Sequence, residues 1–331
     1  MKKLINLTMF DLLKGVAMLL VMFGHSFGGE NAELGEWFGK ILYSVLMPSF
    51  FIVSGYWLKK KKIKVGVKTS VEYLLLPYCV VMILIDCVGL TYRLLQGEFQ
   101  DWVTNFLIPS VFVLTSRPNR VGPMWFVFAL FLAWCIFYIV IHIKNEKIQY
   151  GLAFFSAILG GVLLPLKLPF QIAQGLVAFF YVYCGYILKK KKVLDKKNHP
   201  ALYVVLALVW LATVVFGSMN LYEHDVKYGI VSILGSFCGA YILIKLFLYI
   251  NLLEWRVLDG IRWIGRYSMW FLCLHTLEHG AFPWSILFKF VKQGTLHASL
   301  LFFLLRLILV IIGCVVLQKI QLYWIARKEK N

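Results

Sequence analysis

Long apolar stretches alternate with short polar segments along almost the whole chain. An α-helix needs about 20 mainly apolar residues to cross a bilayer. Candidate spans lie near residues 10–28, 38–58, 71–92, 124–143, 150–165, 170–188, 201–219, 228–250, 264–282 and 298–325. The pattern predicts an all-α fold, a polytopic membrane helix bundle of about ten transmembrane helices. No soluble domain or long linker interrupts it, so we expect one integral-membrane domain over residues 1–331.

One further apolar stretch, residues 102–115, is short and contains Pro109. It is typical of a re-entrant or interfacial segment rather than of a crossing. Cytoplasmic loops are enriched in Lys and Arg, and this rule predicts that both termini lie in the cytoplasm. The basic segments that then fall on the inner side are Lys59–Lys68, Lys189–Lys197, Arg256–Arg266 and the tail from Arg327. An eleventh crossing would put Lys189–Lys197 outside.

Composition agrees with lipid as the main solvent. Hydrophobic residues make up 61% of the chain and charged residues 15%, and the mean hydropathy is +0.78, which the surface of a water-soluble domain does not tolerate. The net charge of +18 lies in short loops, so topology explains it better than nucleic-acid binding. The seven Cys lack the close spacing of a zinc or redox motif, and we interpret them as small buried hydrophobes. The first apolar run follows two lysines as in a signal peptide, but no convincing cleavage site follows, so we expect a retained helix.

Ionisable side chains inside the spans are candidate site residues, because each costs at least a few kcal/mol unless it faces the protein interior or a water-filled cavity. On the first span, Lys14 and His25 fall within about 20° of each other and roughly 16 Å apart along the axis. A cavity on that face would join the cytoplasmic end of the helix to the outer half of the bilayer. The alternative is an ion pair between Asp11 and Lys14 at the helix end, with a merely interfacial His25.

A second group lies on the ninth span. Arg262 and Arg266 mark its cytoplasmic start, and His275, Glu278 and His279 follow at or beyond mid-depth. Two helices thus bring histidines to similar levels in the bilayer.

The remaining charges are candidates one by one. Asp86 on the third span and Arg306 on the tenth lie toward the outer half, where either could orient an imidazole or stabilise developing charge. For Arg306 a purely structural pair with a carboxylate is the alternative. The basic loop that contains Lys64 and Lys68 is first of all a topology signal and an anionic-lipid contact. Its functional interpretation is a cytoplasmic landing site for the phosphates of a nucleotide-containing donor.

Five motifs follow one another on the predicted spans. They are Lys14 with His25 ten positions after Gly15, Met47-Pro48-Ser49-Phe50-Phe51 before Ser54-Gly55-Tyr56, Leu76-Pro77-Tyr78, Met124-Trp125-Phe126, and Ile264-Gly265-Arg266-Tyr267-Ser268 before His275. In order and spacing this set resembles the membrane-bound acyltransferase 3 family over nearly the whole chain. Within the family it is most similar to the fucose 4-O-acetylase-like branch.

The resemblance implies an O-acyltransferase with an acyl-CoA donor, most often one that moves acetyl from cytoplasmic acetyl-CoA to a hydroxyl of a cell-envelope or exported glycan. It implies a multi-pass protein of the cell (plasma or inner) membrane. From the charge and cysteine patterns we expect no nucleic-acid partner and no metal. His25 would be the general base for the acceptor hydroxyl, with a covalent acyl-histidine as the alternative. The residues expected to hold the CoA phosphates are Lys14, Lys64, Lys68, Arg262 and Arg266. Because the outer loops are short, a lipid-linked or nascent envelope glycan is the expected acceptor.

Two positions depart from the family pattern. Many relatives have two arginines before the Leu-Pro-Tyr segment, where this chain has Thr69, Ser70, Glu72 and Tyr73. Many also carry a Glu after the Trp-Phe segment, where Ala129 and Leu130 stand here. Asp86 and Glu278 are therefore the candidates for the carboxylate partner of the catalytic histidine.

The alternative function is that of a transporter or flippase for a polysaccharide or lipid-linked intermediate, since aligned intramembrane charges also mark transport pathways. Proline interrupts several spans, as the broken helices of a transporter would require, at Pro48, Pro77 and Pro165. Release of CoA from a thioester donor would distinguish the enzyme from the transporter.

Overall fold

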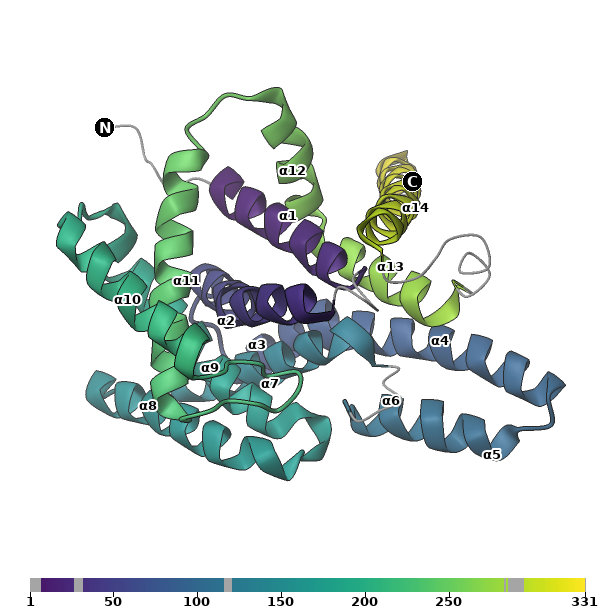
Figure 1. The fold of residues 1–331 in the computed structure, drawn as a ribbon, viewed down its shortest axis with the longest axis horizontal. Coiled ribbons are helices and arrows are strands. Elements are labelled where there is room, and N and C mark those ends of the chain that lie inside the picture. Colours follow the sequence, from purple (N-terminus) through teal and green to yellow (C-terminus); the bar gives the residue numbers. More distant parts are fainter. Residues whose placement is uncertain (1–6, 27–31, 116–120, 283, 285–294, 331) are drawn as a thin grey trace.

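The computed structural model describes residues 7–26, 32–115, 121–282, 284 and 295–330. In these residues the fold is helical, with one isolated bridge between Asn220 and Asp225. The α-helices, shown in Figure 1, are α1 (Leu7–Gly24), α2 (Ala32–Trp57), α3 (Ile63–Ser70), α4 (Leu76–Leu95), α5 (Phe99–Trp102), α6 (Ile108–Phe112), α7 (Trp125–Val140), α8 (Glu146–Leu163), α9 (Ile172–Lys190), α10 (Pro200–Phe216), α11 (Ile230–Ile250), α12 (Arg256–Arg266), α13 (Ser268–Ala281) and α14 (Leu296–Lys330).

Seven helical segments are long and apolar enough to cross a membrane, counted over the described residues. They are Trp37–Trp57, Ile63–Leu95, Gly122–Val140, Glu146–Leu166, Pro169–Lys190, Ile230–Ile250 and Leu296–Tyr323. Each coincides with a predicted span, and the shorter helices α1, α10 and α13 overlap the other three. The prediction of a polytopic membrane helix bundle is confirmed.

The apolar stretch at 102–115 is mainly helical. A π-helical turn joins α5 to α6, and together they form one continuous helical segment from Phe99 to Phe112. This segment lies along α4 (Figure 1), where the Ser110 hydroxyl donates to Asp86 Oδ1 at 2.9 Å and the Trp102 indole donates to the Asp86 carbonyl at 2.9 Å. Its length is roughly 20 Å, which is too short for a hydrocarbon core of about 30 Å.

Two glycine contacts set the helix crossings that shape the interior. A Cβ added to Gly15 of α1 would stand 2.0 Å from the Ile261 carbonyl oxygen of α12, and one added to Gly265 would stand 1.7 Å from the Asp11 carbonyl oxygen. Small residues let helix backbones approach in this way in membranes. The crossing brings the basic face of α12 beside the first turns of α1.

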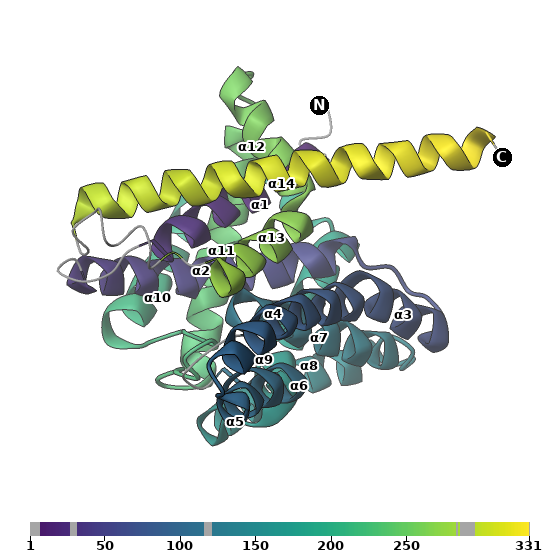
Figure 2. The ribbon, with the colours of Figure 1, turned by 90° about the vertical axis from the view of Figure 1, so that its right-hand side faces the viewer.

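The same device joins α2 to α9. A Cβ on Gly55 would lie 1.9 Å from the Val182 carbonyl oxygen, and a Cβ on Gly185 would lie 1.9 Å from that of Ile52. This reciprocal contact gives a physical reason for the glycine in the Ser54-Gly55-Tyr56 motif. Figure 2 shows the long helix α14 lying across α13 and α1, which it contacts.

Candidate functional site

A cavity of about 570 Å³ lies between α1, α2, α7 and α13. One face of α1 and the residue that follows it line the cavity, at positions Lys14, Met18, Val21 and His25. These positions recur every three or four residues, which is the period of one helix face. The stripe derived from the sequence is thus the wall of a real cavity.

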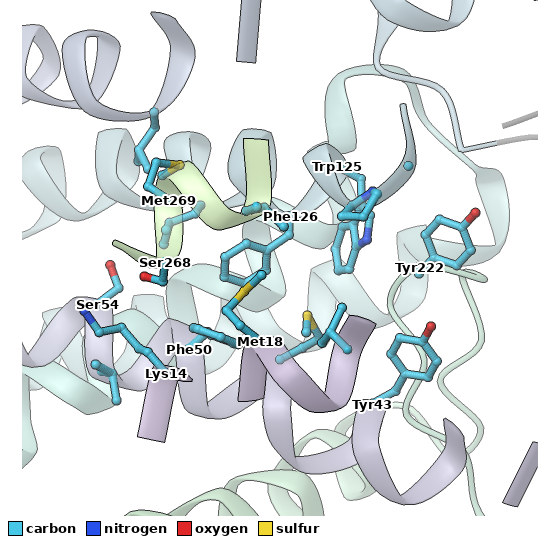
Figure 3. A pocket seen from close by; sticks show the side chains of 18 of the residues that line it. Lys14, Met18, Tyr43, Phe50, Ser54, Trp125, Phe126, Tyr222, Ser268 and Met269 are labelled. Atoms are coloured by element: carbon cyan, nitrogen blue, oxygen red, sulfur yellow. The ribbon is translucent and has the colours of Figure 1, made fainter. Parts of the chain in front are cut away.

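The two ends of this cavity differ in chemistry. Figure 3 shows Lys14 beside Ser54 at one end. At the other end stand three aromatic side chains, Tyr43, Trp125 and Tyr222. The wall between the ends includes Met18, Phe50 and Phe126, so the middle is apolar.

The lysine end carries an excess of positive charge. Asp11 pairs with Lys14 at 3.0 Å and with Arg266 at 3.8 Å, so that two cations share one carboxylate. Arg262, which lies on α12 with Arg266, is bound to Asp259 at 2.6 Å and to the Asn251 side chain at 3.2 Å. The ion pair considered as the alternative for Lys14 is present, and Lys14 lines the cavity as well.

The other two lysines expected near a donor lie away from the cavity. Lys64 and Lys68 are exposed on α3, and neither lines the cavity. Lys68 pairs with Glu72 at 3.7 Å. The structure therefore places Lys14 and Arg266 together and leaves Lys64 and Lys68 on the surface.

Three histidines meet at the far end of α1. His25 follows the last turn of the helix, and its ring centroid lies 5.3 Å from that of His275 and 6.0 Å from that of His279. The two α13 rings are 6.4 Å apart. His25 and His279 line the cavity, whereas His275 stands behind them with no exposed surface.

Glu278 holds the buried histidine in one orientation. Its Oε1 lies 2.7 Å from His275 Nδ1, and its Oε2 accepts a hydrogen bond of 2.6 Å from the Trp284 indole. A proton shared with the carboxylate sits on Nδ1, which leaves Nε2 with a lone pair. That Nε2 atom is buried and has no hydrogen-bond partner among the described residues, which is unusual for a buried polar atom.

Arg306 of α14 ties the cluster together. Its Nη1 donates to the His25 carbonyl at 3.1 Å, its Nη2 lies 3.1 Å from His279 Nδ1, and its Nε lies 3.5 Å from Glu278 Oε2. The guanidinium also stands 5.2 Å from the centre of the Trp284 ring. The sequence marked Arg306 as a charge that could orient an imidazole or pair with a carboxylate, and the structure shows it beside both His279 and Glu278. The sequence did not identify Trp284, since an indole near a helix end carries no distinguishing signal.

Of the two carboxylates considered as partners of the histidines, the structure brings Glu278 to them. Asp86 instead accepts the Ser110 hydrogen bond on the far side of α4 and does not line the cavity. Within the described residues no group of three or more His, Cys, Asp or Glu side chains is arranged to hold a metal ion. The site thus offers imidazoles, one carboxylate and one guanidinium as its reactive groups.

A comparison with protein families gives one match. The family model described as Acyltransferase domain, that of the acyltransferase 3 family, matches residues 8–319. The matched range contains every residue of the cavity and of the histidine cluster. Neither the curated proteins nor the solved structures gave a match to this chain.

Proposed function

Because this chain belongs to the acyltransferase 3 family, we propose that it transfers an acetyl group from cytoplasmic acetyl-CoA to a hydroxyl of a cell-envelope or exported glycan. The observation that carries the proposal is the single cavity with a cationic end at Lys14 and a histidine at the other end. A donor with a polyanionic head, a thin arm and a reactive tip matches that order of surfaces. A lipid-linked or nascent envelope glycan is the acceptor that the short outer loops favour.

The donor enters from the cationic end. Lys14 and Arg266 together outweigh the single charge of Asp11, so this end attracts the CoA phosphates. The pantetheine arm then lies along the apolar wall formed by Met18, Phe50 and Phe126. This places the thioester near His25.

The chemistry is an addition and elimination at the thioester carbonyl. His25 takes the proton of the acceptor hydroxyl, the oxygen forms a bond to the acetyl carbon, and the carbon–sulfur bond breaks. The imidazolium returns the proton to the thiolate, which leaves as free CoA. Behind His25, away from the cavity, Glu278 holds His275 in place. The negative charge of this carboxylate lies on the side of His25 on which the imidazolium forms, one residue removed from it.

The first test is thioester turnover by purified protein given acetyl-CoA and a panel of glycans. We expect release of free CoA in the wild type, and a fall of about 10²–10⁴-fold in His25→Ala, the range for a lost general base. His297→Ala is the matched control, because that histidine is exposed at the start of α14. Full activity in a folded His25→Ala variant would refute the assignment. Movement of a glycan across vesicles without CoA release in the wild type would favour the transporter.

A second test concerns the donor end. Lys14→Ala should raise the KM for acetyl-CoA while leaving that for S-acetylpantetheine, which has no nucleotide phosphates, unchanged. An equal rise for both donors would show that Lys14 does not bind the phosphates.

A further inference from the structure

The end of the cavity opposite Lys14 is built from three aromatic side chains on separate elements. Tyr43 comes from α2, Trp125 from the start of α7 and Tyr222 from the segment between α10 and α11, and all three line the cavity (Figure 3). The ring centroids of Trp125 and Tyr222 are 6.3 Å apart at 48°. His25 shares this region, since it also lines a smaller adjoining cavity with Tyr43.

These side chains combine apolar faces with polar edges. In the part of the chain that the structure describes, neither the Tyr43 hydroxyl nor the Trp125 indole nitrogen makes a hydrogen bond. Neither atom is among the buried polar atoms that lack a partner, and both side chains line the cavity, so a ligand with hydroxyl groups can reach these polar edges and bind them. A pyranose ring has apolar C–H faces and a rim of hydroxyls, and matches both properties.

Tyr222 lies on a loop, residues 217–229, that is fastened internally. The backbones of Asn220 and Asp225 exchange hydrogen bonds of 2.7 and 2.9 Å. The Asn220 side chain accepts hydrogen bonds from the backbone N–H groups of Tyr222 at 3.1 Å and Glu223 at 3.2 Å. The turn that carries Tyr222 is therefore fixed at both its backbone and its side chains.

His224 fastens the same loop to the rest of the protein. Its Nε2 lies 2.6 Å from the Thr115 hydroxyl, and its Nδ1 lies 3.0 Å from Nε2 of the fully buried Gln174 on α9. The residue adopts φ +57°, a conformation that non-glycine residues keep only where their surroundings hold them. Burial lowers the pKa of the His224 imidazole, which favours the neutral ring.

We propose that Tyr43, Trp125 and Tyr222 form the acceptor subsite, which binds one pyranose ring beside His25, and that His224 is a positioning residue that sets Tyr222 against it. The inference rests on the proposed function and adds to it the chemical class and the place of the acceptor. The subsite lies at the end of the cavity opposite the donor entrance, so donor and acceptor enter the cavity from different ends.

The test combines binding with kinetics, on full-length protein in lipid nanodiscs. Saturation-transfer NMR with methyl α-L-fucopyranoside and methyl β-D-glucopyranoside reports binding without turnover. Tyr222→Ala should lose the transfer signal and raise the acceptor KM about tenfold, with the KM for acetyl-CoA unchanged. Tyr222→Phe, which keeps the ring, should retain the signal. Tyr228→Ala is the control, because Tyr228 lies in the same loop but is 60% exposed.

The positioning role of His224 has its own readout. His224→Ala should raise the acceptor KM while kcat changes little, and His224→Asn should restore it in part, because Asn tolerates a positive φ and keeps polar contacts. If the wild type releases CoA but Tyr222→Ala binds the glycosides and keeps the acceptor KM of the wild type, the subsite alone would be overturned. If the wild type binds the glycosides but releases no CoA, and Tyr222→Ala loses that binding, the acyl transfer would be overturned and the subsite would stand.

Discussion

The glycine crossing between α1 and α12 leads to a prediction with an internal control. Helix α12 carries two glycines in different surroundings. A Cβ on Gly265 would stand 1.7 Å from the Asp11 carbonyl oxygen, whereas a Cβ on Gly260 would meet nothing within 4 Å. The same substitution to Ala therefore tests close backbone approach at one site and helix propensity alone at the other.

The magnitudes follow from these distances. Ordinary contact begins at 3.4 Å, so in Gly265→Ala the two backbones must part by about 1.7 Å, which is the difference between 3.4 and 1.7 Å. Overpacking of this kind costs about 1–3 kcal/mol or more, while Ala gains up to about 1 kcal/mol over Gly in a helix. Gly260→Ala should be neutral or slightly stabilising, and Gly265→Ala should be destabilising. Because the displaced turn also carries Asp11 and Lys14, Gly265→Ala should raise the KM for acetyl-CoA.

The assay is thermal unfolding of the purified variants, followed by CoA release at varied acetyl-CoA concentration. We expect a lower unfolding temperature than the wild type in Gly265→Ala and no such decrease in Gly260→Ala. Equal shifts in both variants, or an unaltered Gly265→Ala protein, would refute the packing of α1 on α12 described above.

Two further predictions concern the other end of the cavity. Arg306→Gln leaves the Glu278 carboxylate buried without its cation, so it should lower the free energy of unfolding by about 3–5 kcal/mol. A denaturant titration of the variant against the wild type measures this loss. CoA release by the variant should also fall. Acid should weaken the Tyr222 loop. Burial, and secondarily Lys167, lowers the pKa of His224 below the unfolded value of 6.5, while a backbone hydrogen bond at Leu164 and the charge of Glu223 oppose this shift. The folded loop therefore binds fewer protons than the unfolded one, and its stability falls as the pH drops below 6.5. Glycoside binding followed by saturation transfer should fall over that range in the wild type and stay level in His224→Asn.

The spans could be predicted because crossing a bilayer is a local property of about 20 consecutive residues. Which helices touch is a different question. The contact between Gly15 and Ile261, or between Gly55 and Val182, joins residues far apart in the chain, and nothing in hydropathy selects one glycine over another. Gly260 and Gly265 look alike in the sequence and differ completely in the structure.

In the site, too, local features could be predicted from the sequence and contacts between distant segments could not. The stripe with Lys14 and His25 was found because helical periodicity is known in advance. The contact between His275 and Glu278 is also local, since the two stand three residues apart on one helix. Depth in the bilayer alone did not separate Asp86 from Glu278 as the partner carboxylate, because Asp86 is engaged by Ser110 from a segment that folds back along α4.

The central part of the site could not be predicted from local patterns. The central position of Arg306, which reaches His25, Glu278 and His279, results from α14 lying across two other helices. The three aromatic side chains of the proposed acceptor subsite likewise come from elements separated by long stretches of sequence, and their meeting is a tertiary event.

The claim on which the account rests is that one cavity connects a cytoplasmic donor with an acceptor on the opposite face. Sidedness of transfer in proteoliposomes of known orientation tests it most directly. With acetyl-CoA supplied only on the Lys14 side and methyl α-L-fucopyranoside only on the side of the 217–229 loop, acetylated glycoside should accumulate on the loop side while free CoA stays with the donor. Equal transfer when acetyl-CoA is supplied only on the loop side would contradict the account.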